Sequence, residues 1–183
     1  MSKLLDESNN GLTVVQLGNP QLRQLSREIA TPPSAAIQTL IDQLLTTVQA
    51  EHGVGIAAPQ VGENVRLIII ASRPNLRYPN APKMEPTPML NPQLLSHSID
   101  TVNGWEGCLS VPGIRGLVPR YREIEIAYQD RWGEHHRQVL KDFVARIFQH
   151  ELDHLEGRVF LDRVESTLDL MSEAEYQKRV VVG

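Results

Sequence analysis

The chain has 183 residues, of which 41% are hydrophobic and 22% are charged, and its formal net charge is -4. This size and composition predict a single soluble domain with its own core, and the negative charge argues against a nucleic-acid-binding surface. The single cysteine excludes an internal disulfide and favours a reducing compartment such as the cytoplasm. No apolar run approaches the roughly 20 residues that cross a bilayer, and the polar N-terminus does not resemble a secretory signal.

The first third of the chain predicts an irregular arm over residues 1–19, followed by a long helix. Apolar residues recur at helical spacing from Ile37 to Val48, which is typical of an amphipathic helix ending near Gly53. The small residues of 53–62 then allow another backbone or a ligand to approach closely. They do not form a phosphate loop, because the G-K-[ST] ending is absent.

The middle of the chain predicts strands separated by a long loop. The Ile-rich run 65–71 indicates a buried strand, and the proline-rich segment 72–88 indicates either the rim of a site or a surface excursion. One or two short strands are expected over 90–102, interrupted by Asn91-Pro92. Regular alternation over 122–130 predicts another strand, with 135–140 as its partner.

The order of helix, strands and helix favours an α+β fold with a mostly antiparallel sheet. We expect one catalytic domain over residues 1–183. Residues 1–11 and 166–183 are expected to be peripheral, and the polar tail from Ser166 is expected to be a frayed helix or a mobile end.

Residues 142–157 read DFVARIFQHELDHLEG and contain an H-E-x-x-H motif. Asp142 is a favourable N-cap and Gly157 a favourable left-handed stop, so the segment predicts a helix of about four turns. His150 and His154 lie four residues apart and therefore share one face. Two imidazoles at this spacing chelate a metal ion, and the neighbouring carboxylate of Glu151 can move protons. Two hydrogen-bonded core histidines are the alternative.

The motif leaves the third metal ligand open. In the pattern H-E-x-x-H-x-x-G-x-x-H the last position is here Phe160, which cannot bind a metal. Glu173 or Glu175 would be the ligand if the chain were a zinc endopeptidase. Cys108 is the better candidate, because a turn between glycines can present its thiolate to a metal. Cys108 could also be a buried apolar side chain or a nucleophile.

Three segments resemble the signature motifs of peptide deformylase. They are GVGIAAPQ at 53–60, EGCLS at 106–110 and QHELDHLEG at 149–157, and they occur in that family's order. The resemblance spans about residues 12–164. It implies an α+β fold in which mostly antiparallel strands pack around a central helix carrying the motif. It also implies a hydrolase that removes the N-formyl group from the starting formyl-methionine of newly synthesised polypeptides.

The resemblance assigns a role to each candidate residue. Cys108, His150 and His154 would bind the metal and leave a fourth position for water. Glu151 would act on that water as general base and then as general acid.

The resemblance also implies that the Gln60 amide and the Leu109 N–H stabilise the developing oxyanion. The expected substrate-binding residues offer backbone groups to the peptide or form an apolar pocket for methionine: Val54, Gly55, Gly107 and Phe143.

The implied cofactor is one Fe²⁺ per chain, and Zn²⁺, Ni²⁺ or Co²⁺ suit the same donors. The implied partners are N-formylmethionyl nascent peptides, with transient ribosome association but no direct nucleic-acid or membrane binding. We expect a monomer.

A structural metal site without catalysis is a further alternative, which would recruit His135 or His136 as a fourth ligand. Two arginines near the motifs also lead to expectations. Arg115 is expected either to steady Glu106 or the loop, or to be an ordinary surface residue. Arg146 is expected to line the pocket mouth with its charged head in water.

Overall fold

The computed structural model describes residues 11–182, so most of the expected N-terminal arm lies outside the described residues. The helices are α1 (Ala35–Ala50), α2 (Asp142–Leu155) and α3 (Glu173–Tyr176). The strands are β1 (Gly55–Ala57), β2 (Leu67–Ile70), β3 (Thr87–His97), β4 (Thr101–Cys108), β5 (Val111–Tyr121), β6 (Glu123–Gln129), β7 (His135–Lys141) and β8 (Leu170–Ser172). No helix in this part of the chain is long and apolar enough to cross a membrane.

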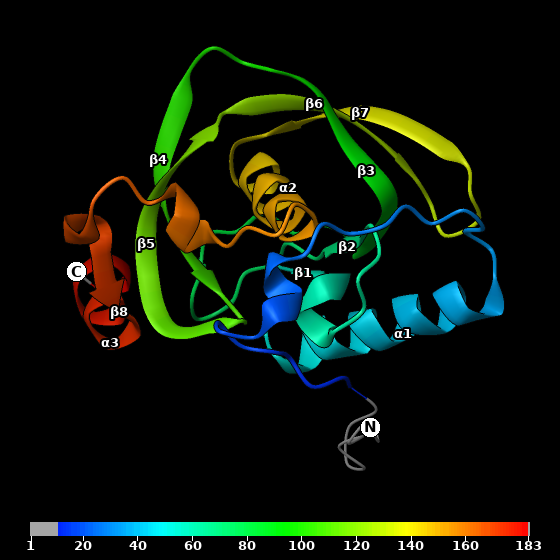
Figure 1. Cartoon of the computed structure of the whole chain (residues 1–183). Helices are drawn as coiled ribbons and strands as arrows, with labels where there is room; N and C mark the ends of the chain where they lie inside the picture. Colours follow the sequence, from blue (N-terminus) through cyan, green and yellow to red (C-terminus); the bar gives the residue numbers. More distant parts are fainter. Residues whose placement is uncertain (1–10, 183) are drawn as a thin grey trace.

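The strands form two sheets around one helix. Five strands pair in the order β1-β2-β3-β6-β7 and three in the order β4-β5-β8, and every pair of neighbours is antiparallel. Figure 1 shows α2 at the centre, with α1 on the outside beyond β1 and β2. The predicted α+β fold with a central motif helix is therefore confirmed.

The two faces of β2 explain why its sequence is apolar throughout. Leu67 and Ile69 pack in the cluster that includes α1, whereas Ile68 and Ile70 pack in the cluster that includes α2. Successive side chains of a strand point to opposite faces, so a strand between two helices must be apolar at every position. This buried layer holds α2 beside β1.

The sequence predicts the C-terminal end of α2 correctly, but not its N-terminal cap. Gly157 has φ +70°, as predicted for a left-handed stop, and a Cβ there would lie 2.8 Å from the carbonyl oxygen of Arg23. The N-cap residue is Lys141, whose side chain makes no capping hydrogen bond, and Asp142 is the first helical residue with φ +48°, so the expected N-cap at Asp142 is wrong. The carboxylate lies 3.7 Å from the Arg122 guanidinium instead.

Three segments of the chain depart from the sequence-based expectation. Residues 111–121, for which no strand was predicted, form β5, and residues 87–97 form the single strand β3 with a register shift beyond Leu90. The tail that was expected to be frayed or mobile instead forms β8, which pairs with β5, followed by α3. β8 adds to the free edge of β5, a pairing between segments too distant in sequence for a local pattern to reveal.

Candidate metal centre and substrate cleft

Three metal-ligating side chains converge between β4 and α2. Cys108 is the last residue of β4, and His150 and His154 lie one turn apart on α2. Each offers one ligand atom, and these three atoms lie within 4.8 Å of one another. The distance from Cys108 Sγ to His154 Nε2 is 3.3 Å. The structure therefore brings together the predicted cysteine and both predicted histidines.

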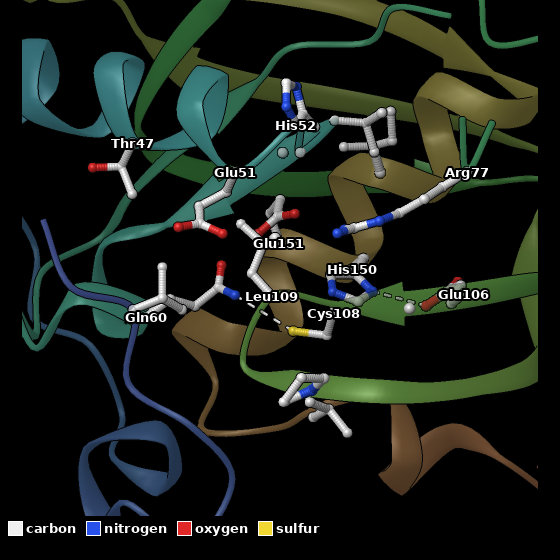
Figure 2. Close-up of a pocket in the computed structure, with 18 of the residues that line it drawn as sticks. Thr47, Glu51, His52, Gln60, Arg77, Glu106, Cys108, Leu109, His150 and Glu151 are labelled. Carbon is white, nitrogen blue, oxygen red and sulfur yellow. Dashed lines mark hydrogen bonds and ion pairs between the residues drawn. The ribbon is translucent and has the colours of Figure 1, made fainter. Parts of the chain in front are cut away.

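Glu106 fixes the orientation of the first histidine. Its Oε2 lies 2.9 Å from His150 Nδ1, which leaves the other ring nitrogen for the site, as Figure 2 shows. The same carboxylate accepts two hydrogen bonds from Arg120, at 2.9 and 3.0 Å, and one from Arg146 at 2.8 Å. Arg120 also donates to Asp153 at 2.6 Å. Carboxylate–histidine pairs of this kind orient metal ligands and raise their basicity.

Glu151 is buried between α2 and β1. Its Oε2 has no hydrogen-bond partner among the described residues, which is costly for a charged oxygen. Burial raises the pKa of Glu151 to about 7, although His150 and His154 act in the opposite direction. Gly55 leaves room for the Glu151 carboxyl group, because a Cβ at residue 55 would lie 2.5 Å from Glu151 Oε1.

Gln60 approaches the centre with a fixed amide orientation. Its Oε1 accepts a hydrogen bond from the Ala57 N–H at 2.9 Å. Its Nε2 therefore points to Cys108 Sγ at 3.4 Å and to Ser110 Oγ at 3.2 Å. Because Gln60 belongs to the 3₁₀ turn Ala58–Val61 that follows β1 directly, the small residues of 53–59 bring this donor close to the sulfur.

The electrostatics of the three ligand side chains suit a divalent cation. Burial tends to raise the pKa of Cys108, but the charges and hydrogen bonds of His154 and His150 outweigh it and lower that pKa to about 5. A thiolate with two imidazoles is a donor set that binds Fe²⁺, Co²⁺, Ni²⁺ or Zn²⁺. The described residues fit such a metal by donor type, by convergence and by the orienting contact to Glu106.

A cleft of about 520 Å³ opens in front of these residues. Its lining includes every residue predicted for substrate binding or for oxyanion stabilisation: Val54, Gly55, Gln60, Gly107, Leu109 and Phe143. Cys108, His150 and Glu151 line it as well, whereas His154 is buried behind them. One cleft therefore gives a ligand access to the candidate metal-binding side chains and to the buried carboxyl group of Glu151.

Three expectations about polar residues need correction. The Arg146 head is not in water, because it donates to the carbonyl oxygens of Val102, Gly104 and Val118 and to Glu106. β4 and β5 present these acceptors to the face of α2 from which Arg146 projects.

Of the three alternatives for Arg115, the surface position and the contact to Glu106 are wrong, since Arg115 is 1% exposed and pairs with Glu173. That pairing uses one of the two carboxylates, Glu173 and Glu175, that the endopeptidase alternative offered as a metal ligand. His136 lies instead in an exposed group with Asp130 and Glu134 on the β6–β7 hairpin, and His135 is exposed beside it.

The sequence reasoning missed Arg120 and Tyr78. Arg120 follows Gly116 and Val118 at every second position of β5, and all three are buried. An arginine in phase with inward-facing residues was the available signal for a buried charge pair. Tyr78 lies in the proline-rich loop, where no periodicity indicates which side chain turns inward.

Comparisons with known proteins agree with this site. The family model of polypeptide deformylase matches residues 12–169. Peptide deformylase 2 of Nostoc sp. is 59% identical over 169 residues, which cover 92% of this chain and 94% of that protein. Peptide deformylase 1 of Bordetella pertussis is 40% identical over 151 residues, covering 82% of this chain and 86% of that protein.

Solved structures show the same fold. A class I type b peptide deformylase from Acinetobacter baumannii, with Met-Ala-Ser bound, has a TM-score of 0.82 and 42% identity, covering 84% of this chain and 98% of that chain. A peptide deformylase from Synechococcus elongatus in complex with actinonin has a TM-score of 0.78 and 34% identity, covering 92% of this chain and 86% of that chain. Fold, site and similarity over most of its length agree: the chain belongs to the polypeptide deformylase family.

Proposed function

We propose that this protein hydrolyses the N-formyl group from the formyl-methionine that begins newly synthesised polypeptides, in the cytoplasm, with a divalent cation held by Cys108, His150 and His154. Membership of the family supports N-terminal deformylation. The observation that carries the metal-dependent mechanism is the convergence of one sulfur and two imidazole nitrogens within 4.8 Å, beside a buried carboxyl group. A bound cation would polarise the formyl carbonyl and lower the pKa of a water molecule.

Glu151 is the proposed proton carrier. Its partnerless Oε2 is available to accept a proton from the attacking water, and a pKa of about 7 lets the group both take up and release a proton near neutral pH. The water oxygen bonds to the formyl carbon. The C–N bond of the formamide then breaks as Glu151 returns the proton to the departing amine. The products are formate and a free N-terminal methionine.

The developing negative charge on the formyl oxygen needs hydrogen-bond donors. Gln60 Nε2 is held beside the sulfur by the contact between Gln60 Oε1 and Ala57, so it is the proposed first donor to the formyl oxygen. The N–H of Leu109, one residue beyond Cys108, is the proposed second donor. Val54 and Phe143 lie on the lining of the same cleft and are the proposed apolar contacts for the methionine side chain.

The test is turnover of formyl-Met-Ala-Ser after anaerobic reconstitution with Fe²⁺ or Ni²⁺. We expect formate release by the wild type and a loss of about 100-fold or more in kcat for Glu151→Gln, because a positioned general base contributes about that much. The matched control is Glu156→Gln, which changes a surface carboxylate near the end of the same helix. Wild-type protein without formate release under these conditions would contradict the proposal.

A second substitution separates deformylase from endopeptidase chemistry. Cys108→Ser should abolish formate release, because the thiolate is the proposed third ligand. A zinc endopeptidase that used Glu173 would retain most of its activity in this variant. The endopeptidase reading is not favoured, because both Glu173 oxygens accept hydrogen bonds from Arg115 and neither Glu173 nor Glu175 converges with the two histidines.

A further inference from the structure

The C-terminal segment makes a set of contacts at the rim of the cleft that the proposed chemistry does not use. Glu173 Oε2 accepts from Arg115 Nε at 2.6 Å and Glu173 Oε1 accepts from Arg115 Nη2 at 3.1 Å. The Tyr176 ring lies 4.6 Å from Arg115 Cζ. These contacts order a segment whose sequence is polar and whose strand β8 pairs with only three residues of β5.

Arg115 connects that segment to the proline-rich loop. Its Nη1 donates to the Tyr78 hydroxyl at 2.8 Å, and its guanidinium lies 5.2 Å from the Tyr78 ring. The Tyr176 hydroxyl makes a second connection, because it donates to the carbonyl oxygen of Arg77 at 3.3 Å. The loop is therefore attached to the C-terminal segment by two separate hydrogen-bonded contacts.

Tyr78 in turn contacts both sides of the peptide cleft. Its hydroxyl accepts a hydrogen bond from the Gly107 N–H at 3.3 Å, one residue before the metal-binding cysteine. Its ring packs against Phe143 with a centroid separation of 5.0 Å, on the proposed methionine pocket. A Cβ at Gly107 would lie 2.8 Å from the Arg115 guanidinium, so a larger residue there would displace that side chain.

We infer that residues 170–176 form a C-terminal latch that sets the width of the substrate cleft by holding Tyr78 through Arg115. Glu173 and Arg115 are positioning residues for the peptide, and this inference rests on the proposed function. The latch reaches the cleft wall but not the proton carrier, since Glu151 and Gln60 are held by β1, α2 and the turn that follows β1. Loosening the latch therefore weakens peptide binding more than it slows hydrolysis.

The experiment compares Glu173→Gln with Glu175→Gln in the full-length, metal-loaded protein. Both variants remove one negative charge from α3, but Glu175 is exposed and does not contact Arg115. We expect Glu173→Gln to raise KM for formyl-Met-Ala-Ser about fivefold or more while kcat stays within about twofold, and Glu175→Gln to change neither. Equal KM values in the two variants would overturn the latch.

Limited trypsin digestion gives a readout that does not depend on catalysis. The loop contains cleavable bonds after Arg77 and Lys83, and the latch contacts the Arg77 carbonyl directly. Glu173→Gln should be cut at these bonds faster than wild type and Glu175→Gln, at a temperature where all three proteins remain folded. Identical cleavage rates would contradict the inference.

Tyr176→Phe tests the second contact and covers the case in which Glu173→Gln does not fold. It removes only the hydroxyl that donates to Arg77, so a smaller rise in KM and in cleavage rate is expected, and no change in either would overturn the latch. Failure of the proposed function is distinguishable, because it would appear as wild-type protein that releases no formate.

Discussion

Two arginine–carboxylate pairs support the cleft: Arg120–Glu106 behind it, here called the inner wall, and Arg115–Glu173 at its opening, here called the rim. The two pairs differ in how much of each side chain is exposed to water. At the inner wall the side chains of Arg120 and Glu106 are each 4% exposed. At the rim Arg115 is 1% exposed, whereas its partner Glu173 is 34% exposed. Removing either carboxylate leaves a buried arginine, but Glu173 keeps part of its contact with water, so losing its pairing costs less than losing the fully buried Glu106.

This contrast assigns different tasks to the two regions. The inner wall orients His150 through Glu106, and a metal ligand must stay within a narrow range of positions. The rim holds a loop beside the space for the peptide, where sequences that vary from one substrate to the next must be accepted. Rigid support behind the proposed metal ligands and more adjustable support in front of them would suit the proposed removal of formyl groups from many different polypeptides.

The largest expected effect comes from breaking the inner wall with Glu106→Gln. This change leaves Arg120 and Arg146 buried without their shared carboxylate, so we expect a loss of about 3 to 5 kcal/mol in the free energy of unfolding. Metal affinity should fall by about tenfold or more, because His150 loses its orienting partner. Urea denaturation and metal titration measure the two effects.

Glu134→Gln is the matched control for Glu106→Gln, since Glu134 is exposed on the β6–β7 hairpin. It should leave stability and metal affinity unchanged. Equal free energies of unfolding for the two variants would show that the buried Glu106 contributes no more to stability than an exposed glutamate.

Gln60→Ala is expected to have the next largest effect. It removes a donor that the Ala57 contact holds in place, so kcat should fall by about 100-fold. KM should change little if the amide acts mainly on the transition state. Steady-state kinetics with Gln93→Ala, an exposed glutamine on β3, as control would measure this. A rise in KM at constant kcat would assign Gln60 to substrate binding instead.

Gly55→Ala displaces the proton carrier without altering its chemistry. The added Cβ would lie 2.5 Å from Glu151 Oε1 and 2.8 Å from Ile147 Cγ2. A shift of Glu151 by a fraction of an ångström to an ångström should reduce kcat by about tenfold or more. Metal content, measured alongside, should stay at the wild-type level, and an unchanged kcat would mean that Glu151 tolerates the displacement.

The smallest expected effect is a pH dependence confined to the rim. Burial tends to raise the pKa of Glu173, but hydrogen bonds from Arg115 and Gln177 together with the charge of Arg115 hold that pKa below its ordinary value of 4.5. A lowered carboxyl pKa stabilises the fold at higher pH, and this contribution is lost as the pH falls through the folded-state pKa.

Thermal unfolding of wild type and Glu173→Gln measures this contribution. The difference in Tm should be constant above about pH 5 and should narrow at lower pH, because protonated Glu173 resembles the glutamine. A difference that stays constant down to about pH 3 would show that the ionised carboxylate contributes nothing to the latch.

The sequence by itself determined which side chains could hold a metal and move a proton. His150 and His154 share a face because four residues make about one helical turn, and Gly157 ends the helix because only a left-handed residue fits there. The small residues 53–59 indicated that the segment ending at Gln60 could approach another part of the chain closely, and Gln60 Nε2 lies 3.4 Å from Cys108 Sγ. These features depend on local geometry, which a short stretch of sequence fixes.

Only the tertiary structure decided what supports that chemistry. Arg120 lies 14 residues from Glu106, and Glu173 lies 58 residues from Arg115, and no local pattern specifies either partner. Strand periodicity can indicate that Arg120 points inward, but which carboxylate it meets depends on which segments fold over it. The latch, the buried position of Arg146 and the inward turn of Tyr78 all follow from packing between distant segments.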